Sequence, residues 1–404
     1  MEEFVTVEGA RAMIAERLPP PQPELVPLNE ALGRILLDEV ICTQPIPPFP
    51  NSAMDGYAVR ASDLESSGGR LRIAGEVRAG QWPDTPVSEG SCLRIMTGAP
   101  LPRGADAVVP VEWTVEENGA VVITRGIEAG RHVRPAGQDM AVGERVLPAG
   151  VRLGAAEVSV LATLGLTPVR VGRQPLVSVL STGDELVAPD QTPAAGQIRN
   201  SNGHALAARA RMAGAQIDES ITARDRTDEV ARAVEEARRA DVLVVSGGVS
   251  VGRYDIVKDV LDAAGMELVF WKVRQRPGKP LAFGVLGKTL VFGLPGNPVS
   301  SSVCFDQYVR PALVRMQGGA QGIWRGRARL TEEIAKPDGL HVFARVRIDT
   351  GAEGDLRATP AGAQGSNISM SLVRADGIAH LPAALEAAPA GTLVEVELLD
   401  PSRR

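Results

Sequence analysis

One loop of the sequence has residue types that suit binding of an anion together with a metal. Residues 241–245 read as a short strand, and Ser246-Gly-Gly-Val-Ser-Val-Gly-Arg-Tyr-Asp255 follows directly. The glycines allow close approach of the backbone to a ligand, and a helix pattern beginning at Ile256 directs N–H groups toward an anion. A carboxylate at such a rim, here Asp255, usually indicates a divalent cation. A plain structural turn is the alternative.

A second loop, Ser181-Thr-Gly-Asp-Glu-Leu186, also follows a strand pattern. Thr182 and the Gly183 amide have the donors to hold an oxyanion, and Asp184 and Glu185 have the oxygens to hold a divalent cation. The alternative is a polar loop in which Asp184 caps a helix. Such short motifs are frequent, so both interpretations stay open.

A third loop carries cations and prolines between two predicted strands, from Trp271 to Pro280. Its four cations are Lys272, Arg274, Arg276 and Lys279. Prolines and a glycine interrupt this charge run, which favours a loop of fixed shape over a solvated face. We therefore predict that it clamps an anion.

A fourth loop, Gly293-Leu-Pro-Gly-Asn-Pro298, joins a strand to a helix. A turn explains its glycines, but it does not readily explain two rigid prolines around Gly296-Asn297. In the N-terminal half, three turns expose hydroxyls and carboxylates, and each taken singly is more typical of structure than of function. They are Ser52–Tyr57, Met96–Asp106 and Gly137–Asp139.

Other chemistry finds little support in the sequence. Gly287-Lys288-Thr289 resembles a phosphate loop, but position 282 is alanine where the partner glycine belongs. There is no GxGxxG fingerprint, and the three cysteines and four histidines lack metal-ligand spacing.

Bulk properties set the class of protein. A chain of 404 residues is long enough for two to four domains. A formal charge of −6 argues against general nucleic-acid binding. The acidic start, Met1-Glu-Glu-Phe, does not resemble a signal peptide, and no stretch is long and apolar enough for a membrane span. We expect a cytoplasmic protein.

The periodicity of apolar residues predicts a multidomain α/β plus β protein. Helices are expected at Val7–Leu18, 28–37 and Val151–Leu164, and short alternating runs from Leu71 to Val146 predict a small sandwich-like or barrel-like β-domain. From residue 175, strands alternate with helices, which predicts a mostly parallel sheet with ligand loops at the carboxyl ends of its strands. The predicted helices of this part are Asn202–Ala213, Asp228–Arg239, Ile256–Ala264 and Val299–Met316. After Gly319 the pattern is β again and predicts a C-terminal barrel-like domain.

Together these loops closely resemble one family, the molybdopterin molybdotransferases of MoeA type, which are equivalent to the E-domain of gephyrin. Six strings carry the resemblance, in the order of the family and over nearly the whole chain. They are 50–58 (PNSAMDGYA), 97–109 (TGAPLPRGADAVV), 181–186 (STGDEL), 246–252 (SGGVSVG) with Asp255, 277–280 (PGKP) and 293–300 (GLPGNPVS).

The resemblance implies a domain division and a reaction. The domains would be an N-terminal elongated domain (1–44 and 147–172), an inserted β-domain (45–146), an α/β molybdopterin-binding domain (173–317) and a C-terminal β-domain (318–404). The reaction would insert molybdenum from molybdate into adenylylated molybdopterin and release AMP, with Mg²⁺ as the divalent cation. It also implies a homodimer with a site shared between subunits. A molybdopterin adenylyltransferase would supply its substrate.

The resemblance and the loop motifs together select the candidate site residues. Candidate catalytic residues are Asp55, Thr97, Asp139, Glu185, Asp225 and Asp255, and candidate metal ligands are Asp184, Glu185 and Asp255. Candidate substrate-binding residues are Ser181, Thr182, Gly183, Ser246, Gly247, Gly248, Ser250, Lys272, Arg276, Lys279, Pro295, Asn297, Pro298, Arg345 and Ser366. Two positions depart from the family pattern: Arg276 stands where many members have lysine, and Leu340 where arginine is frequent.

Two other functions remain as alternatives. A non-catalytic molybdopterin-binding or scaffolding protein of the gephyrin E-domain type is one, although Glu185 and Asp255 argue against it. An adenylyltransferase that makes the substrate is the other, and the β-domains at both ends of the chain argue against that.

Overall fold

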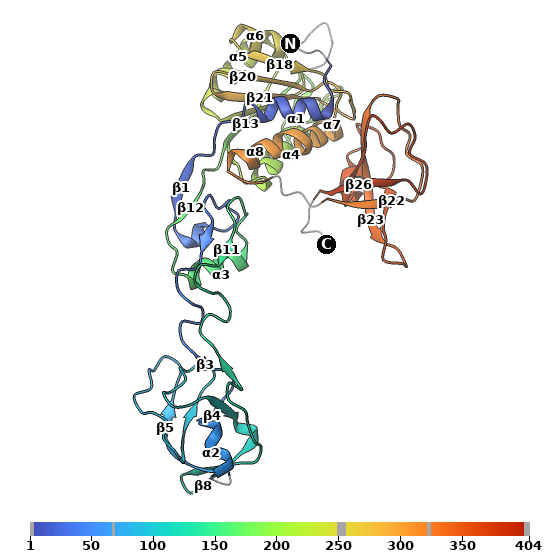
Figure 1. Cartoon of the computed structure of the whole chain (residues 1–404). Coiled ribbons are helices and arrows are strands. Elements are labelled where there is room, and N and C mark those ends of the chain that lie inside the picture. Colours follow the sequence, from blue (N-terminus) through green and yellow to red (C-terminus); the bar gives the residue numbers. More distant parts are fainter. Residues whose placement is uncertain (1–3, 67–68, 249–255, 321–324, 400–404) are drawn as a thin grey trace. The chain divides into compact units, whose positions relative to one another are not determined.

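The computed structural model describes residues 4–66, 69–248, 256–320 and 325–399, and these divide into two compact units (Figure 1). The first unit consists of Met1–Leu37, Gly150–Val158 and Thr167–Arg404, and the second of Asp38–Ala149 and Ser159–Leu166. Among the helices of these described ranges, none combines the length and the apolar character needed to cross a membrane.

A six-stranded sheet forms the centre of the first unit, in the order β16-β13-β17-β21-β20-β18. Its strands are β13 (Leu176–Thr182), β16 (Gln216–Ala223), β17 (Val242–Ser246), β18 (Glu267–Trp271), β20 (Ala282–Leu286) and β21 (Thr289–Leu294). The pairs β16–β13, β13–β17 and β17–β21 are parallel, and β20 is antiparallel to both of its neighbours. The predicted mostly parallel sheet is therefore confirmed.

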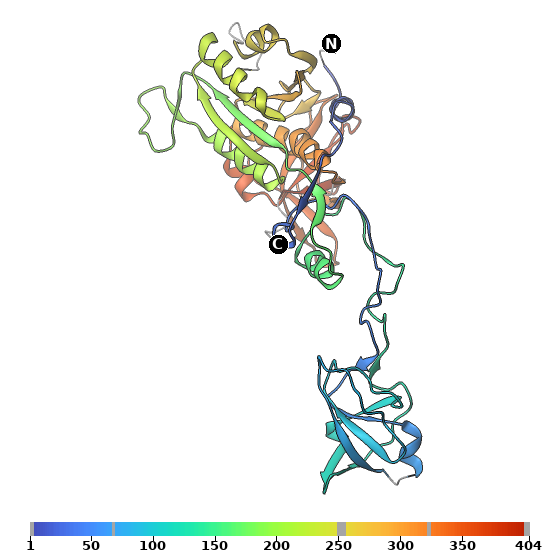
Figure 2. The ribbon, with the colours of Figure 1, turned by 90° about the vertical axis from the view of Figure 1, so that its left-hand side faces the viewer.

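Helices cover both faces of this sheet (Figures 1 and 2). Alternation along β17 explains why, because Val242 and Val244 pack into one apolar core while Leu243 and Val245 pack into the other. The first core is completed by α1 (Val7–Ala15), α4 (Ser201–Met212), α7 (Pro298–Cys304) and α8 (Arg310–Met316). The second is completed by α5 (Thr227–Glu236) and α6 (Ile256–Ala263).

The long helix predicted at Val299–Met316 is present, but a π-helical turn, η4 (Phe305–Val309), joins α7 to α8. In this turn the Arg310 N–H donates to the Phe305 carbonyl, five residues back. One extra residue in a turn rotates the following side chains to new directions, and such bulges are frequent at functional sites.

The N-terminal segment corrects one prediction. Strand β1 (Pro23–Val26) pairs with β12 (Val169–Gly172), and the helix predicted over 28–37 is wrong. Only a 3₁₀ turn, η1 (Leu28–Glu30), forms there. Gly33 has φ +77°, and Ile35 and Leu36 then make bridges to Arg152 and Val171, so extended pairing takes the apolar residues that the helix pattern would have used.

The C-terminal part is a barrel of five strands, which the pairing of β23 with β25 closes. The strands are β22 (Arg325–Leu330), β23 (His341–Thr350), β24 (Leu356–Pro360), β25 (Gly377–Leu381) and β26 (Leu393–Leu398), with a short helix α9 (Met370–Arg374). A sixth short strand, β19 (Gln275–Arg276), comes from the cation-rich loop of the α/β domain and pairs with β23 in parallel. The predicted barrel-like domain is thus confirmed, and it includes a strand from another domain.

The second unit is a small β-structure built on a six-stranded mixed sheet, in the order β7-β4-β6-β5-β9-β8. These strands are β4 (Gly56–Val59), β5 (Arg70–Val77), β6 (Ser91–Ile95), β7 (Ala107–Pro110), β8 (Thr114–Glu117) and β9 (Ala120–Ile123). Four short strands form two pairs, β10 (Val133–Arg134) with β3 (Asn51–Ser52), and β11 (Arg145–Leu147) with β2 (Val40–Ile41). Helix α2 (Ala61–Ser66) lies beside the sheet, and α3 (Ala155–Thr163) begins in the first unit and ends in the second.

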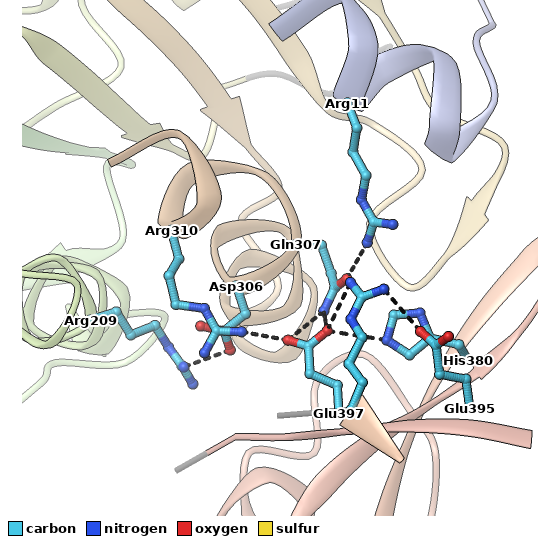
Figure 3. A network of polar contacts seen from close by, with 9 residues as sticks. Arg11, Arg209, Asp306, Gln307, Arg310, His380, Glu395 and Glu397 are labelled. Carbon is cyan, nitrogen blue, oxygen red and sulfur yellow. Dashed lines mark hydrogen bonds and ion pairs between the residues drawn. The ribbon is translucent and has the colours of Figure 1, made fainter. Parts of the chain in front are cut away.

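A buried polar network joins the barrel to the α/β domain within the first unit (Figure 3). Its centre is Glu397 on β26, which is fully buried. The Glu397 carboxylate pairs with Arg310, lies 3.7 Å from Arg325, and lies 3.2 Å from Nε2 of His380. Burial raises the pKa of Glu397, but the hydrogen bond from His380 and the arginine charges outweigh it and hold that pKa below its usual value.

We expect Glu397→Gln to destabilise this junction by about 3 kcal/mol at pH 7, because the variant removes the buried counter-charge of two arginines. A lowered folded pKa means that the ionised carboxylate stabilises the protein above the ordinary glutamate pKa and loses that effect as the pH falls through the folded value. The ordinary glutamate pKa of about 4.3 sets the range to examine, roughly pH 3 to 8. Over this range, the difference in melting temperature between the natural protein and the variant should shrink as the pH falls.

Glu395→Gln is the matched control, since Glu395 lies on the same strand and pairs with Arg325 at 2.9 Å but is about half exposed. Exposed pairs contribute little, so its loss should be below about 1 kcal/mol. An equal loss in the two variants, or a gap that does not change with pH, would contradict the buried ion-pair role.

Candidate functional site

Three strand ends meet at one level of the α/β sheet. Ser181 on β13 stands opposite Ser246 on β17, and Ser246 stands opposite Leu294 on β21. Because the strands are parallel, the loops that follow them start from the same edge, where α/β proteins bind ligands. A cleft of about 520 Å³ lies there, which is a size suited to a small molecule.

Most of the residues predicted from the strand-end loops line this cleft. They are Ser181, Thr182, Gly183, Glu185, Asp225, Ser246, Gly247, Gly248, Pro295, Asn297 and Pro298. The structure therefore brings the first, second and fourth loops of the sequence together around one space. Ser250 and Asp255, which were predicted for the same site, lie outside the described residues.

Two glycines in the loop after β17 have a structural reason to be glycine. Gly247 and Gly248 have φ of +95° and +64°. A Cβ on Gly247 would lie 2.7 Å from the Thr182 carbonyl oxygen, and one on Gly248 would lie 2.4 Å from a methyl group of Val257. The loop therefore packs against Thr182 and the start of α6 as bare backbone, which leaves the cleft open.

Sequence reasoning missed the segment that leads into α4. Arg199, Asn200, Ser201 and Asn202 line the cleft, as does Gly296. The Asn200 side chain accepts from the Gly203 N–H at 3.0 Å and caps the helix. The signal was present as an asparagine three residues before a helical glycine.

Asn202 connects two of the strand-end loops. Its Nδ2 donates to Ser246 Oγ at 2.9 Å and to the Gly296 carbonyl at 2.7 Å. One side chain thus fixes the spacing between the end of β17 and the proline loop. Sequence alone does not show this role, because both partners are distant in the chain.

Two hydroxyls at the end of β13 lack a hydrogen-bond partner in the described part of the chain. Ser181 Oγ and Thr182 Oγ1 are buried and unpartnered among the described residues. Buried hydroxyls are usually satisfied, so an unpartnered pair beside a cleft is a typical sign of a ligand-binding region.

Carboxylates gather on one side of the cleft. Glu185 and Asp225 line it, and Asp184 Oδ1 accepts from the Asp225 N–H at 3.2 Å. Partial burial raises the pKa of Asp225, and the charges of Asp184 and Glu185 raise it further. Oxygen donors suit Mg²⁺, although no group of three possible metal ligands stands together among the residues described.

The four cations of the third loop lie in different surroundings, and their role as an anion clamp stays a prediction. Arg274 and Lys279 both approach the ring of Phe4, at 5.3 and 5.0 Å from its centre. Arg276 instead lines a cavity of about 250 Å³ beside the barrel. Arg276 reaches this cavity because β19 pairs with β23 and so lies beside the barrel.

None of these four cations makes an ion pair with a carboxylate in the part of the chain that the structure describes. Lys272 adopts φ +72°, a conformation rare for residues other than glycine. Unneutralised cations on a loop of fixed shape suit an anionic ligand.

Arg345 and Ser366 belong to the C-terminal barrel, where it adjoins the α/β domain. Arg345 is buried and lines the same cavity as Arg276, and burial lowers its pKa to about 10. It donates to the Gly365 carbonyl at 3.1 Å, which holds the 363–366 loop. The Ser366 carbonyl in turn accepts from the Val299 N–H at 3.1 Å, at the start of α7.

The second unit carries the remaining predicted residues. The Asp55 carboxylate accepts from the Thr97 N–H at 2.7 Å and from the Thr97 hydroxyl at 2.8 Å. These hydrogen bonds lower the pKa of Asp55, which is fully exposed. Asp139 is also exposed, and its N–H donates to the Ile46 carbonyl at 2.9 Å. The structure therefore joins Asp55 with Thr97 and shows no contact from Asp139 to either of them among the described residues.

We expect Asp225→Asn to raise the melting temperature. The rise should be small, on the order of 1 °C, because Asp225 is partly exposed and solvent screens its charge. A raised folded pKa means that the ionised carboxylate costs folding free energy at pH 7, and that cost disappears below the ordinary pKa. Mg²⁺ should raise the melting temperature of the natural protein more than that of the variant. Differential scanning calorimetry measures both effects.

Asp228→Asn is the control with the opposite sign. A hydrogen bond from Arg226 lowers the pKa of Asp228, so its ionised form is favoured in the folded protein. That variant should melt slightly lower and keep the full response to Mg²⁺. If Asp225→Asn also melts lower, or if Mg²⁺ acts equally on all three proteins, Asp225 has no part in a carboxylate cluster that holds a cation.

Known protein families match three successive parts of the chain. Three family models match: "MoeA N-terminal region (domain I and II)" at residues 5–165, "Probable molybdopterin binding domain" at 178–315 and "MoeA C-terminal region (domain IV)" at 327–399. A molybdopterin molybdenumtransferase of Haemophilus influenzae is 36% identical over 98% of each chain. One of Nostoc sp. is 39% identical over 74% of this chain and 70% of its own.

Solved structures agree with these matches. The crystal structure of a molybdopterin biosynthesis MoeA protein from Pyrococcus horikoshii superposes with a TM-score of 0.82. It is 33% identical to this chain, and the match covers 98% of this chain and 100% of that one. The order of the domains, the whole-length relatives and the shared fold together place the chain in the MoeA family.

Proposed function

We propose that this protein is a molybdopterin molybdenumtransferase. It transfers molybdenum from molybdate to adenylylated molybdopterin, cleaves the pyrophosphate link and releases AMP. The observation that carries the proposal is the cleft at the ends of β13, β17 and β21, in which unpartnered hydroxyls, bare glycine backbone and carboxylates face one space. Relatives at 36% identity over the full length bear the name of this activity.

The cleft has groups for both ends of a phosphate-bearing substrate. Backbone N–H groups of the glycine loops and the capped start of α4 bind phosphate oxygens. Asn202 keeps the Ser246 loop and the Gly296 loop at a constant spacing. The rigid prolines of the fourth loop, Pro295 and Pro298, form part of the cleft wall and would support the pterin rings of the substrate.

Mg²⁺ is the divalent cation that the donor set fits. Glu185 and Asp225 would hold it from the cleft wall, with Asp184 beside them. Asp255, the other candidate ligand, lies outside the described residues. When bound, the cation neutralises phosphate oxygens and polarises the bond that breaks.

Molybdate is a small oxyanion and needs cations that are not already paired. Arg276 and Arg345 line one cavity, and within the described part of the chain Arg345 donates its side-chain hydrogen bonds to neutral oxygens only. Glu332 and Glu333 line the same cavity, so an oxyanion would bind on its arginine side, where the two guanidinium groups supply donors and positive charge. Lys272 and Lys279 add positive potential on the same loop.

The direct test is AMP release by the purified protein from adenylylated molybdopterin, followed by chromatography. We expect release only when molybdate and Mg²⁺ are both added. If substrate binds and no AMP forms, the transferase proposal fails. A stable protein partner without turnover would then favour the scaffolding alternative, and ATP-dependent adenylylation of molybdopterin would favour the adenylyltransferase alternative.

We also propose a cytoplasmic homodimer, supplied by a molybdopterin adenylyltransferase, in which a second copy completes the site. Two features support the shared site. One is the cleft in the first unit, and the other is the preorganised Asp55–Thr97 pair in the second. Asp55, Thr97 and Asp139 of the second copy would then act at the cleft of the first. Isologous dimers place such groups in two equivalent sites.

Mixed dimers test this arrangement. Asp55→Asn and Asp225→Asn should each be inactive, and a mixture equilibrated from dissociated subunits should recover about one quarter of the natural activity, because half of the dimers then hold one intact site of two. A mixture of Asp55→Asn with Thr97→Ala is the control and should recover nothing. No recovery in the first mixture, with mixed dimers shown by mass spectrometry, would place both residues in one chain's site.

A further inference from the structure

The cation-rich loop, residues 272–279, is shaped by one buried amide. Val273 and Gln275 point inward and are buried, while Arg274 and Arg276 are exposed. The loop then turns back at Gly278, which has φ +88°. A Cβ there would lie 2.3 Å from Sγ of Cys304, so only glycine allows this turn against α7.

The Gln275 side chain ties the loop to itself and to the helix below. Its Nε2 donates to the Gly278 carbonyl at 2.9 Å, and its Oε1 accepts from the Tyr308 hydroxyl. Gln275 and Tyr308 are each 1% exposed. The bond to Gly278 determines which way the amide faces, since a carbonyl can only accept, and the Tyr308 hydroxyl then donates to the amide oxygen.

The π-helical turn η4 places the Tyr308 hydroxyl at this position. Three successive side chains of the turn contact three different parts of the first unit: Asp306 pairs with Arg209 of α4 at 2.7 Å, Gln307 approaches Glu397 of the barrel at 3.4 Å, and Tyr308 reaches the loop (Figure 3 shows the first two). In a regular α-helix the directions of these residues would differ, because the extra residue of the turn rotates the side chains after it.

We propose that Tyr308 and Gln275 are positioning residues, which hold the cation-rich loop in the conformation that binds the anionic substrate. Neither side chain touches the ligand. Gln275 fixes the distance between the strand that carries Arg276 and the turn that carries Lys279, and Tyr308 anchors this arrangement to the helix. The inference rests on the proposed function for the identity of the anion, molybdate.

Removing one partner leaves the other unsatisfied in the interior. In Tyr308→Phe the ring still fills its space, but the Gln275 carbonyl loses its only donor among the described residues. The loop then gains alternative conformations, in which Arg276 and Lys279 are no longer held in the positions that bind the anion. Anion affinity should fall while the chemical step, which depends on the carboxylate side of the cleft, changes little.

The experiment compares Tyr308→Phe, Gln275→Met and the double variant. For each protein we would measure kcat and KM for molybdate in AMP release, and molybdate binding by equilibrium dialysis without the pterin substrate. We expect KM and the dissociation constant to rise about tenfold in each single variant, with kcat within about threefold of the natural value. The double variant should be no worse than Gln275→Met, because Gln275→Met already removes the hydrogen bond that Tyr308→Phe breaks.

Thr289→Val is the matched control. Thr289 is 1% exposed, and its hydroxyl donates to the Ala240 carbonyl at 2.8 Å, at the end of the α/β sheet opposite the strand-end loops. The substitution removes a buried hydroxyl of the same domain and should lower stability without changing KM for molybdate. Circular dichroism and melting curves confirm that every variant is folded before the constants are compared.

The outcomes separate this inference from the proposed function. If the natural protein binds molybdate but releases no AMP, the function fails, and the dialysis constants still decide the positioning role. The role is overturned if Tyr308→Phe matches Thr289→Val in every constant, if kcat falls as much as KM rises, or if the effects of the two single variants add in the double variant.

Discussion

The parallel pairing of β13, β17 and β21 is the constraint on which the site depends. One in-register row, Ser181, Ser246 and Leu294, lies at the ends of β17 and β21 and one residue before the end of β13. Each following loop must therefore turn over the same edge, and glycine lets it turn without filling the space. Asn202 then sets the spacing of two loops from the start of α4. The cleft follows from strand register first and from particular side chains second.

Like charges gather in two places, the carboxylate side of the cleft and the cation-rich loop. On one side of the cleft, burial raises the pKa of Asp225, and the like charges of Asp184 and Glu185 raise it further. On the cation-rich loop, no carboxylate among the described residues pairs with Lys272 or Lys279. Both arrangements cost folding free energy, and both become favourable with a cation and an anion bound. A net charge of −6 does not oppose this, because binding depends on the local potential.

Local patterns predicted the strand-end loops because a strand, a glycine turn and a helix start are all encoded within about ten residues, the range over which periodicity is informative. Features that depend on distant pairing could not be read in this way. The helix predicted over 28–37 is absent because Leu36 pairs with Val171. Asn202 was missed because its partners, Ser246 and Gly296, are far away in the chain. The pairing of β19 with β23, which places Arg276 beside the barrel, was missed because its partner residues His341 and Val342 are also far away in the chain.

Strand β19 also explains why the C-terminal barrel is inseparable from the site. Gln275 and Arg276 are at once an edge strand of the barrel and part of the cation-rich loop, and the Ser366 carbonyl accepts from Val299 beside the proline loop. Any shift of the barrel must therefore move both of these loops. The charges around Glu397 oppose such a shift, since it would separate a buried carboxylate from the arginine that pairs with it across the domain boundary. The junction consequently acts on the geometry of the loops and not only on the stability of the domain.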